Sequence, residues 1–169
     1  WFATTGSLTF SVLFRPQLTT QDLLLFTLLP AVSIVKTLRD AHVNVMLKWP
    51  NDLLLNGKKV GGVLVETFLA KTAFPDVIVG IGLNLHQRAN DFPPELKHIA
   101  SSMLEESGTA LDSHDLFSRL LQQTDKDYGQ LQTDNDLLFI KREWLRFCCH
   151  LQHEVIVRQG EPQTSGKFI

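Results

Sequence analysis

Three sheet-forming runs follow one another at residues 43–49, 53–66 and 77–85, with little room for helices between them. Within the second run, Asn56-Gly57 is a strong signal for a two-residue turn, because a type I′ turn needs positive φ at both central positions. Strands joined by such short connections pair antiparallel, since a parallel pair needs a long crossover. The runs therefore predict a largely antiparallel sheet.

The segment before these runs predicts one more strand and an interrupted helix. Residues 8–14 begin by alternating apolar and polar side chains, as a half-buried strand does. Thr19 then begins a Thr-x-x-Asp cap, which leads into apolar residues at helical spacing through residue 38. Pro30 should bend or break this helix, because proline lacks the backbone donor that a helix interior uses.

The sequence after Pro93-Pro94 changes to helical patterns. We expect helices at 95–106, from Asp112-Ser113 onward, and at 133–147, with Gly108 ending the first of them. The tail, residues 153–169, has the pattern of a strand, a turn and the start of another strand. The predicted fold class is α+β, a largely antiparallel sheet packed by helices.

Composition narrows the classes of partner and compartment. The 169 residues carry 16 basic and 18 acidic side chains, a net charge of -2, so no basic stripe supports nucleic-acid binding through this segment. Cys148 and Cys149 are adjacent, which is poor geometry for a structural disulfide and lacks the spacing of a zinc site. No run reaches the length of a membrane span. We expect a cytoplasmic protein with no membrane partner and no metal held by its own residues.

Lys48 ends an apolar run directly before a Trp-Pro-Asn-Asp turn, where its ammonium must stay wet or meet an anion. Gly61-Gly62 within a strand allows close approach of a ligand or another chain. The pair Gly80 and Gly82 clears space at the end of the third run. Taken singly, these residues have structural interpretations, as a solvated lysine, a turn and bulges. Their combination in this order favours a ligand site.

That combination resembles the central signature of the biotin protein ligases. The resemblance is carried by Lys48-Trp49-Pro50-Asn51-Asp52, by the run Lys59 to Glu66, and by Gly80-Ile81-Gly82-Leu83-Asn84-Leu85. It covers nearly the whole chain, most strongly residues 43–86 and weakly residues 87–132. It implies a biotin/lipoate ligase-like catalytic domain at 1–150, shortened at its N-terminus, and the incomplete start of a small SH3-like β-barrel at 151–169.

The resemblance also implies an activity and a set of site residues. The family activates biotin with ATP and Mg²⁺ to biotinyl-5′-AMP, then transfers biotin to a lysine of a biotin carboxyl carrier protein, the acetyl-CoA carboxylase subunit. Lys48 would be the catalytic cation and would also bind biotin. The remaining assignments are biotin contacts at Gly61, Gly62 and Leu64, and ATP or adenylate contacts at Trp1, Asn51, Asp52 and Asn84.

Two family segments are expected upstream of Trp1, a Gly-Arg-Gly-Arg-x-Gly adenylate loop and a Ser-Thr-Asn biotin segment. Because this sequence starts at Trp1, we expect the isolated chain to bind biotin poorly. Two alternatives stay open: a lipoate ligase-like enzyme, and a biotin-sensing repressor or assembly module that acts as a homodimer. Residues upstream of Trp1 would discriminate the repressor, and protection by biotin or lipoate would discriminate the two ligases.

Overall fold

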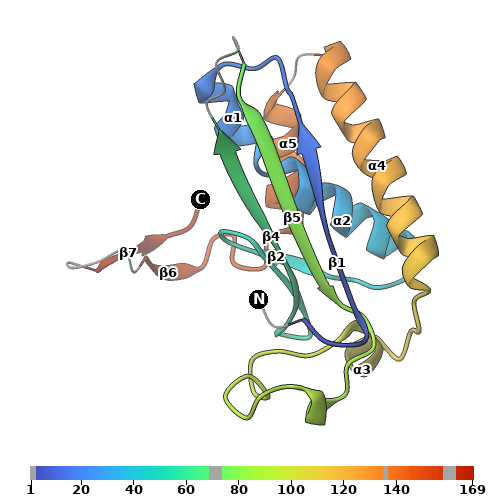
Figure 1. Cartoon of the computed structure of the whole chain (residues 1–169). Helices are drawn as coiled ribbons and strands as arrows, with labels where there is room; N and C mark the ends of the chain where they lie inside the picture. Colours follow the sequence, from blue (N-terminus) through green and yellow to red (C-terminus); the bar gives the residue numbers. More distant parts are fainter. Residues whose placement is uncertain (1–2, 69–73, 135–136, 158–162) are drawn as a thin grey trace.

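The computed structural model of the chain describes residues 3–68, 74–134, 137–157 and 163–169. Its centre is a five-stranded sheet in the order β1-β5-β4-β3-β2, and all neighbouring strands are antiparallel. Helices lie together behind this sheet (Figure 1). The predicted α+β class with a largely antiparallel sheet is confirmed. The strands are β1 (Ser7–Phe14), β2 (Met46–Lys48), β3 (Asp52–Leu55), β4 (Lys58–Phe68) and β5 (Asp76–Asn84).

The turn between β3 and β4 has the predicted geometry. Asn56 has φ of 50° and Gly57 has φ of 80°, the positive values that a type I′ turn requires. Strand β2 is shorter than the predicted run, because it begins only at Met46. The Val43 N–H donates to the Leu38 carbonyl at 2.9 Å, so this end of the run closes the preceding helix instead of pairing in the sheet.

The interrupted helix is confirmed as two helices, α1 (Thr20–Phe26) and α2 (Leu29–Asp40). The Thr19 hydroxyl accepts a hydrogen bond from the Asp22 N–H, which satisfies a free donor of the first turn. Pro30 lies in the first turn of α2, where its missing N–H costs no helical hydrogen bond. The proline therefore starts the second helix.

The predicted helix at 95–106 is wrong over most of its length. Only α3 (Met103–Ser107) forms, with a short 3₁₀ helix, η1 (Ala89–Asp91), upstream. The main chain of residues 99–101 pairs with β4 instead: the Lys59 N–H donates to the Ile99 carbonyl at 2.8 Å, and the Ser101 N–H donates to the Lys59 carbonyl at 3.0 Å. Gly108, with φ of 71°, ends α3 as predicted.

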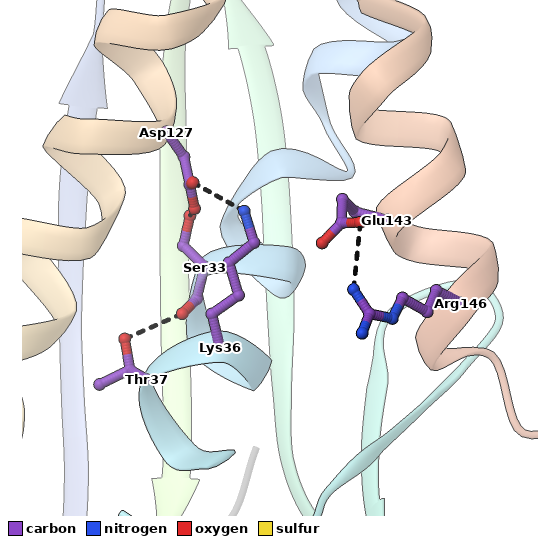
Figure 2. Close-up of polar contacts among 6 residues, drawn as sticks. All are labelled: Ser33, Lys36, Thr37, Asp127, Glu143 and Arg146. Atoms are coloured by element: carbon purple, nitrogen blue, oxygen red, sulfur yellow. Dashed lines mark hydrogen bonds and ion pairs between the residues drawn. The ribbon is translucent and has the colours of Figure 1, made fainter. Parts of the chain in front are cut away.

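The helix layer is tied together by a buried charge (Figure 2). Asp127 of α4 (Ser113–Asp134) is only 2% exposed, and it accepts hydrogen bonds from the Ser33 hydroxyl at 2.7 Å and the Lys36 ammonium at 2.8 Å. A buried carboxylate needs such partners. This contact fixes α4 against α2, and α5 (Leu137–Phe147), which ends where predicted, packs beside α2.

The tail forms the predicted pair of strands, β6 (Glu154–Val157) and β7 (Thr164–Lys167), which are antiparallel to each other. The pair lies to one side of the main sheet (Figure 1). Its predicted turn, residues 159–162, lies outside the described residues. Across the described ranges, none of the helices combines the length and the apolar character that crossing a membrane requires.

Candidate functional site

One row of residues crosses the whole sheet in register and contains most of the predicted site. Lys48 pairs with Asp52, Asp52 with Gly62, Gly62 with Gly82, and Gly82 with Thr9. Directly paired residues of antiparallel strands point to the same face. Lys48 and Thr9, at the two ends of the row, are exposed. The row therefore lies on the open face of the sheet, away from the helices.

The adjacent row has the opposite orientation. Leu47, Leu53 and Leu83 are buried to 2% exposure or less against the helices, and Gly61 pairs within this row. A Cβ added to Gly61 would lie 2.8 Å from Leu83 Cδ2 and 2.9 Å from the Gly82 carbonyl oxygen. The resemblance predicts that Gly61 and Gly62 both contact biotin. In the structure the two glycines lie on opposite faces of the sheet, because successive strand residues alternate.

A cavity of about 320 Å³ lies on the open face. This volume is at the lower end of the range of roughly 300–1,000 Å³ typical of ligand pockets. Three predicted site residues, Asn51, Gly62 and Leu64, line it together. Gly80 and Gly82, the pair expected to clear space, also line it, as do Thr9, Ser11 and Lys59, to which the prediction assigned no role.

Glycines leave the floor of this cavity free of side chains. A Cβ added to Gly62 would lie 3.3 Å from the Asn51 carbonyl oxygen and 3.7 Å from Lys59 Nζ. A Cβ on Gly80 would meet no atom closer than 3.8 Å. A flat ligand can therefore approach the backbone of β4 and β5, while the exposed Leu64 side chain supplies an apolar contact beside it.

Lys48 is not among the residues that line this cavity; it lies in the same row, separated from Gly62 of the lining by Asp52, at a corner of the chain. The Trp49-Pro50 peptide bond is cis, and the Asn51 carbonyl accepts a hydrogen bond from the Val63 N–H at 3.0 Å, which ties the corner to β4. Within the described part of the chain, the Lys48 ammonium makes no hydrogen bond or ion pair. Its charge is thus available to an anionic ligand.

The C-terminal segment supports the corner from the other side. The Cys149 N–H donates to the Leu47 carbonyl at 2.9 Å, and the Trp49 ring lies 5.8 Å from that of Trp144. Burial lowers the pKa of His150, and the positive charge of Lys48 lowers it further. The imidazole beside Lys48 therefore favours its neutral form.

Asn84 stands apart from the cavity lining. The Asn84 side chain is 5% exposed; it donates to the Ser101 carbonyl at 3.0 Å and accepts from the Gln87 amide at 3.3 Å. Its amide is therefore used within the fold, and its adenylate contact stays a prediction. Trp1 lies outside the described residues.

Asp52 forms an ion pair with Lys59, a contact that the sequence analysis missed. Lys59 was quoted in the motif but received no role. The one sequence signal was the pair of glycines that follows it, because glycines within a strand often mark a bulge. Such a bulge changes which face a residue lies on.

Comparison with known proteins agrees with this geometry. The sequence pattern of the Biotin/lipoate A/B protein ligase family matches residues 1–84. Over 124 residues, 73% of the chain, the sequence is 38% identical to the bifunctional ligase/repressor BirA of Bacillus subtilis. Over 123 residues it is 32% identical to the biotin–[acetyl-CoA-carboxylase] ligase of Paracoccus denitrificans. The matched regions span 38% and 51% of these relatives' lengths.

A solved structure extends the similarity to the whole chain. The biotin protein ligase from Aquifex aeolicus, in complex with biotin and ATP, superimposes with a TM-score of 0.83 and 30% identity. The match covers 99% of this chain and 68% of that one. The apo structure of the same ligase matches with a TM-score of 0.80 and 31% identity. By fold and by sequence, this chain belongs to the biotin protein ligase family.

Proposed function

We propose that this chain is the central catalytic segment of a ligase that activates biotin with ATP and transfers it to a protein lysine. The observation that carries the proposal is the in-register row that joins Lys48, through Asp52, to Gly62 on the floor of the cavity. The relatives support the choice of substrate, because the Aquifex ligase was solved with biotin and ATP and the Paracoccus relative is named for acetyl-CoA carboxylase. No feature of the site favours lipoate.

In the first step, a biotin carboxylate oxygen attacks the α-phosphorus of ATP and pyrophosphate leaves. Two anions must approach each other, so a fixed cation stabilises the transition state more than the separated substrates. Lys48 supplies that cation from a corner held by the Asn51–Val63 hydrogen bond. Gly62 and Leu64 provide the room and the apolar contact for the bicyclic end of biotin.

In the second step, the amine of the acceptor lysine attacks the acyl carbonyl of biotinyl-5′-AMP and AMP leaves. Negative charge again develops on oxygen near Lys48, so the same ammonium serves both steps. The acceptor in this proposal is the biotin carboxyl carrier protein of acetyl-CoA carboxylase. Asn51 and Asp52 shape the corner and lie on the adenylate side of the site.

Magnesium enters this scheme with ATP. Mg²⁺ keeps several waters and relies on substrate phosphates, and Asp52 is the carboxylate of the predicted site that could reach it. Among the residues that the structure describes, no cluster of three histidine, cysteine, aspartate or glutamate side chains could hold a metal ion. The final hairpin, residues 151–169, is the start of the small C-terminal β-barrel in this proposal.

Exchange of labelled pyrophosphate into ATP tests the proposal, measured, like every activity below, on the protein that includes the segments expected upstream of Trp1. Exchange that depends on biotin, with none when lipoate replaces it, is the expected result. A second measurement is the melting temperature, which biotin with ATP should raise if the pair binds the folded chain. Exchange driven by lipoate, or no exchange and no stabilisation with either acid, would overturn the assignment.

A further inference from the structure

Four aromatic rings meet beside the corner that joins β2 to β3. Trp49 belongs to the corner, Trp144 to α5, and His150 and Phe168 to the C-terminal segment. The Phe168 ring centroid lies 4.4 Å from that of His150, 6.3 Å from that of Trp144 and 6.5 Å from that of Trp49. Centroids at about 4.5 to 7 Å are typical of interacting aromatic pairs. Phe168 thus connects the C-terminal strand pair to the corner.

Burial distinguishes Phe168 from its neighbours in sequence. Residues 163–167, which include β7, are exposed, and so is Ile169, whereas Phe168 is half-buried against the core. Trp144, against which it packs, is 3% exposed. An aromatic ring supplies a large part of the apolar area that such a short segment can bury. Among residues 163–169, Phe168 is therefore the anchor that holds this end of the chain on the catalytic segment.

Main-chain hydrogen bonds hold Phe168 in place. Its N–H donates to the His153 carbonyl at 3.0 Å, and its carbonyl accepts from the Gln152 N–H at 2.8 Å. Earlier in the same segment, the Cys149 N–H donates to the Leu47 carbonyl of β2. The turn after α5 is thus tied both to β2 and to Phe168.

Trp49 borders open space as well as the aromatic rings. A second cavity, of about 230 Å³, is lined by Trp49 and shares Asn51 and Leu64 with the first cavity. Trp49 is also 51% exposed. Phe168 does not line the second cavity, so it packs against another part of the Trp49 ring. Because a side chain beside a cavity has few atoms to hold it on that side, loss of Phe168 would let the Trp49 ring turn.

We propose that Phe168 is a positioning residue: it holds the Trp49 ring and so fixes Asn51, two residues further on, in the lining of the first cavity. Pro50 lies between them with a restricted φ, so a shift of Trp49 is passed on to Asn51. The Val63 N–H holds the carbonyl end of Asn51 at 3.0 Å, and the Trp49 corner fixes its other end.

The proposal rests on the ligase function proposed above, in which Asn51 lies on the adenylate side of the site. Gly62 and Leu64, the biotin contacts of that function, belong to β4 and are held by its pairing with β5. Loss of Phe168 should therefore weaken the binding of ATP and leave the binding of biotin unchanged.

The first test is Phe168→Ala, assayed by biotin-dependent pyrophosphate exchange. The Michaelis constant for ATP should rise roughly fivefold, the size of effect that loss of one aromatic contact gives, and that for biotin should change by less than about twofold. Ile156→Ala is the matched control, because it removes a side chain that is 58% exposed from the same strand pair. It should leave both constants unchanged. Equal rises for ATP and biotin, or no rise for ATP, would overturn the positioning role.

The second test places Phe168→Ala in a Trp49→Leu background. If Phe168 acts through the Trp49 ring, its loss should now change the Michaelis constant for ATP by less than about twofold. A persistent fivefold rise would mean that Phe168 acts by another route, and would overturn the proposal. Melting temperatures of all variants identify any loss that comes from unfolding.

Hydrogen exchange of the unsubstituted protein tests the same coupling even if Phe168→Ala does not fold. Coupling between two sites is reciprocal, so ATP with biotin should slow exchange of the Phe168 and Gln152 amides roughly threefold relative to the amides of α4. Unchanged relative exchange would overturn the proposal. Failure of the unsubstituted protein to exchange pyrophosphate would instead refute the ligase function itself.

Discussion

Gly61 and Gly62 are adjacent in β4, yet the structure gives them opposite tasks. Gly61 lies on the helix-covered face, where Leu83 and the Gly82 carbonyl leave no space for a Cβ. Gly62 lies on the open face, where its missing side chain keeps the cavity free. The absence of a side chain therefore serves packing at one position and ligand access at the next.

The same contrast holds for the rows to which these glycines belong. The covered row contains Leu47 and Leu53, and mutations in it should lower the free energy of unfolding. The open row contains Lys48 and Asp52, and mutations in it should lower the reaction rate. A mutation in one row that produced the effect expected of the other would contradict this division.

The largest effect is expected for Lys48→Ala, in the open row. Loss of a charge-assisted contact in a dry site typically costs about 2 to 4 kcal/mol, so both half-reactions should slow by roughly two to three powers of ten. Single-turnover assays with biotin plus ATP, and separately with supplied biotinyl-5′-AMP, measure the two steps.

Lys48→Arg is the control for charge at the same position. It should restore activity only in part, because a planar guanidinium does not occupy the place of a compact ammonium. Near-normal rates of Lys48→Ala in both assays would reduce this lysine to a solvated strand end.

In the covered row, Gly61→Ala should lower the free energy of unfolding by about 1 to 3 kcal/mol, because the added methyl group overpacks the core against Leu83. Denaturant titration measures the change. Gly80→Ala is the matched control within the same sheet, since its Cβ would have ordinary contacts at 3.8 Å or more. Equal stability of the two variants would show that the faces do not differ in this way.

The smallest effect is expected for Gly62→Val, which fills part of the cavity. The Michaelis constant for biotin should rise roughly tenfold, while the stability changes by less than about 1 kcal/mol. Steady-state kinetics with biotin and ATP varied separately will show whether the loss is confined to biotin. A similar loss for both substrates, together with a lower melting temperature, would assign Gly62 to packing instead.

Local signals in the sequence predicted the elements that depend on local chemistry. Asn56-Gly57 specified its turn, Thr19 the start of α1, and Gly108 the end of α3, because each position demands a particular φ or a side-chain cap. Pro30 marked the break between α1 and α2 for the same kind of reason. The resemblance to a ligase signature predicted Asn51 as an adenylate contact and Gly62 and Leu64 as biotin contacts, and all three line the cavity.

The features that escaped prediction depend on residues far apart in the chain. The 95–101 segment is not helical because its backbone pairs with Lys59, and no pattern within the segment records that partner. Leu53 pairs with Gly61 but Leu54 with Lys59, so Val60 forms a β-bulge with no opposite residue, and this bulge likewise exists only in the pairing of β3 with β4. Strict alternation of side chains along β4 would place Lys59 on the helix-covered face, whereas Lys59 lines the cavity on the open face.

The strand order has a consequence for how the molecule assembles. Strands β2 to β5 form a meander of neighbours in sequence, whereas β1 must find β5 at its far end, with Ser7 opposite Asn84. Contacts of such long sequence separation close late, because the chain entropy of a long loop is lost before they form. Synthesis from the N-terminus thus makes β1 first of the sheet strands and its partner β5 last. Until β5 is made, β1 has no partner, and until the two strands pair, the nascent chain exposes an unpaired strand edge, which favours aggregation.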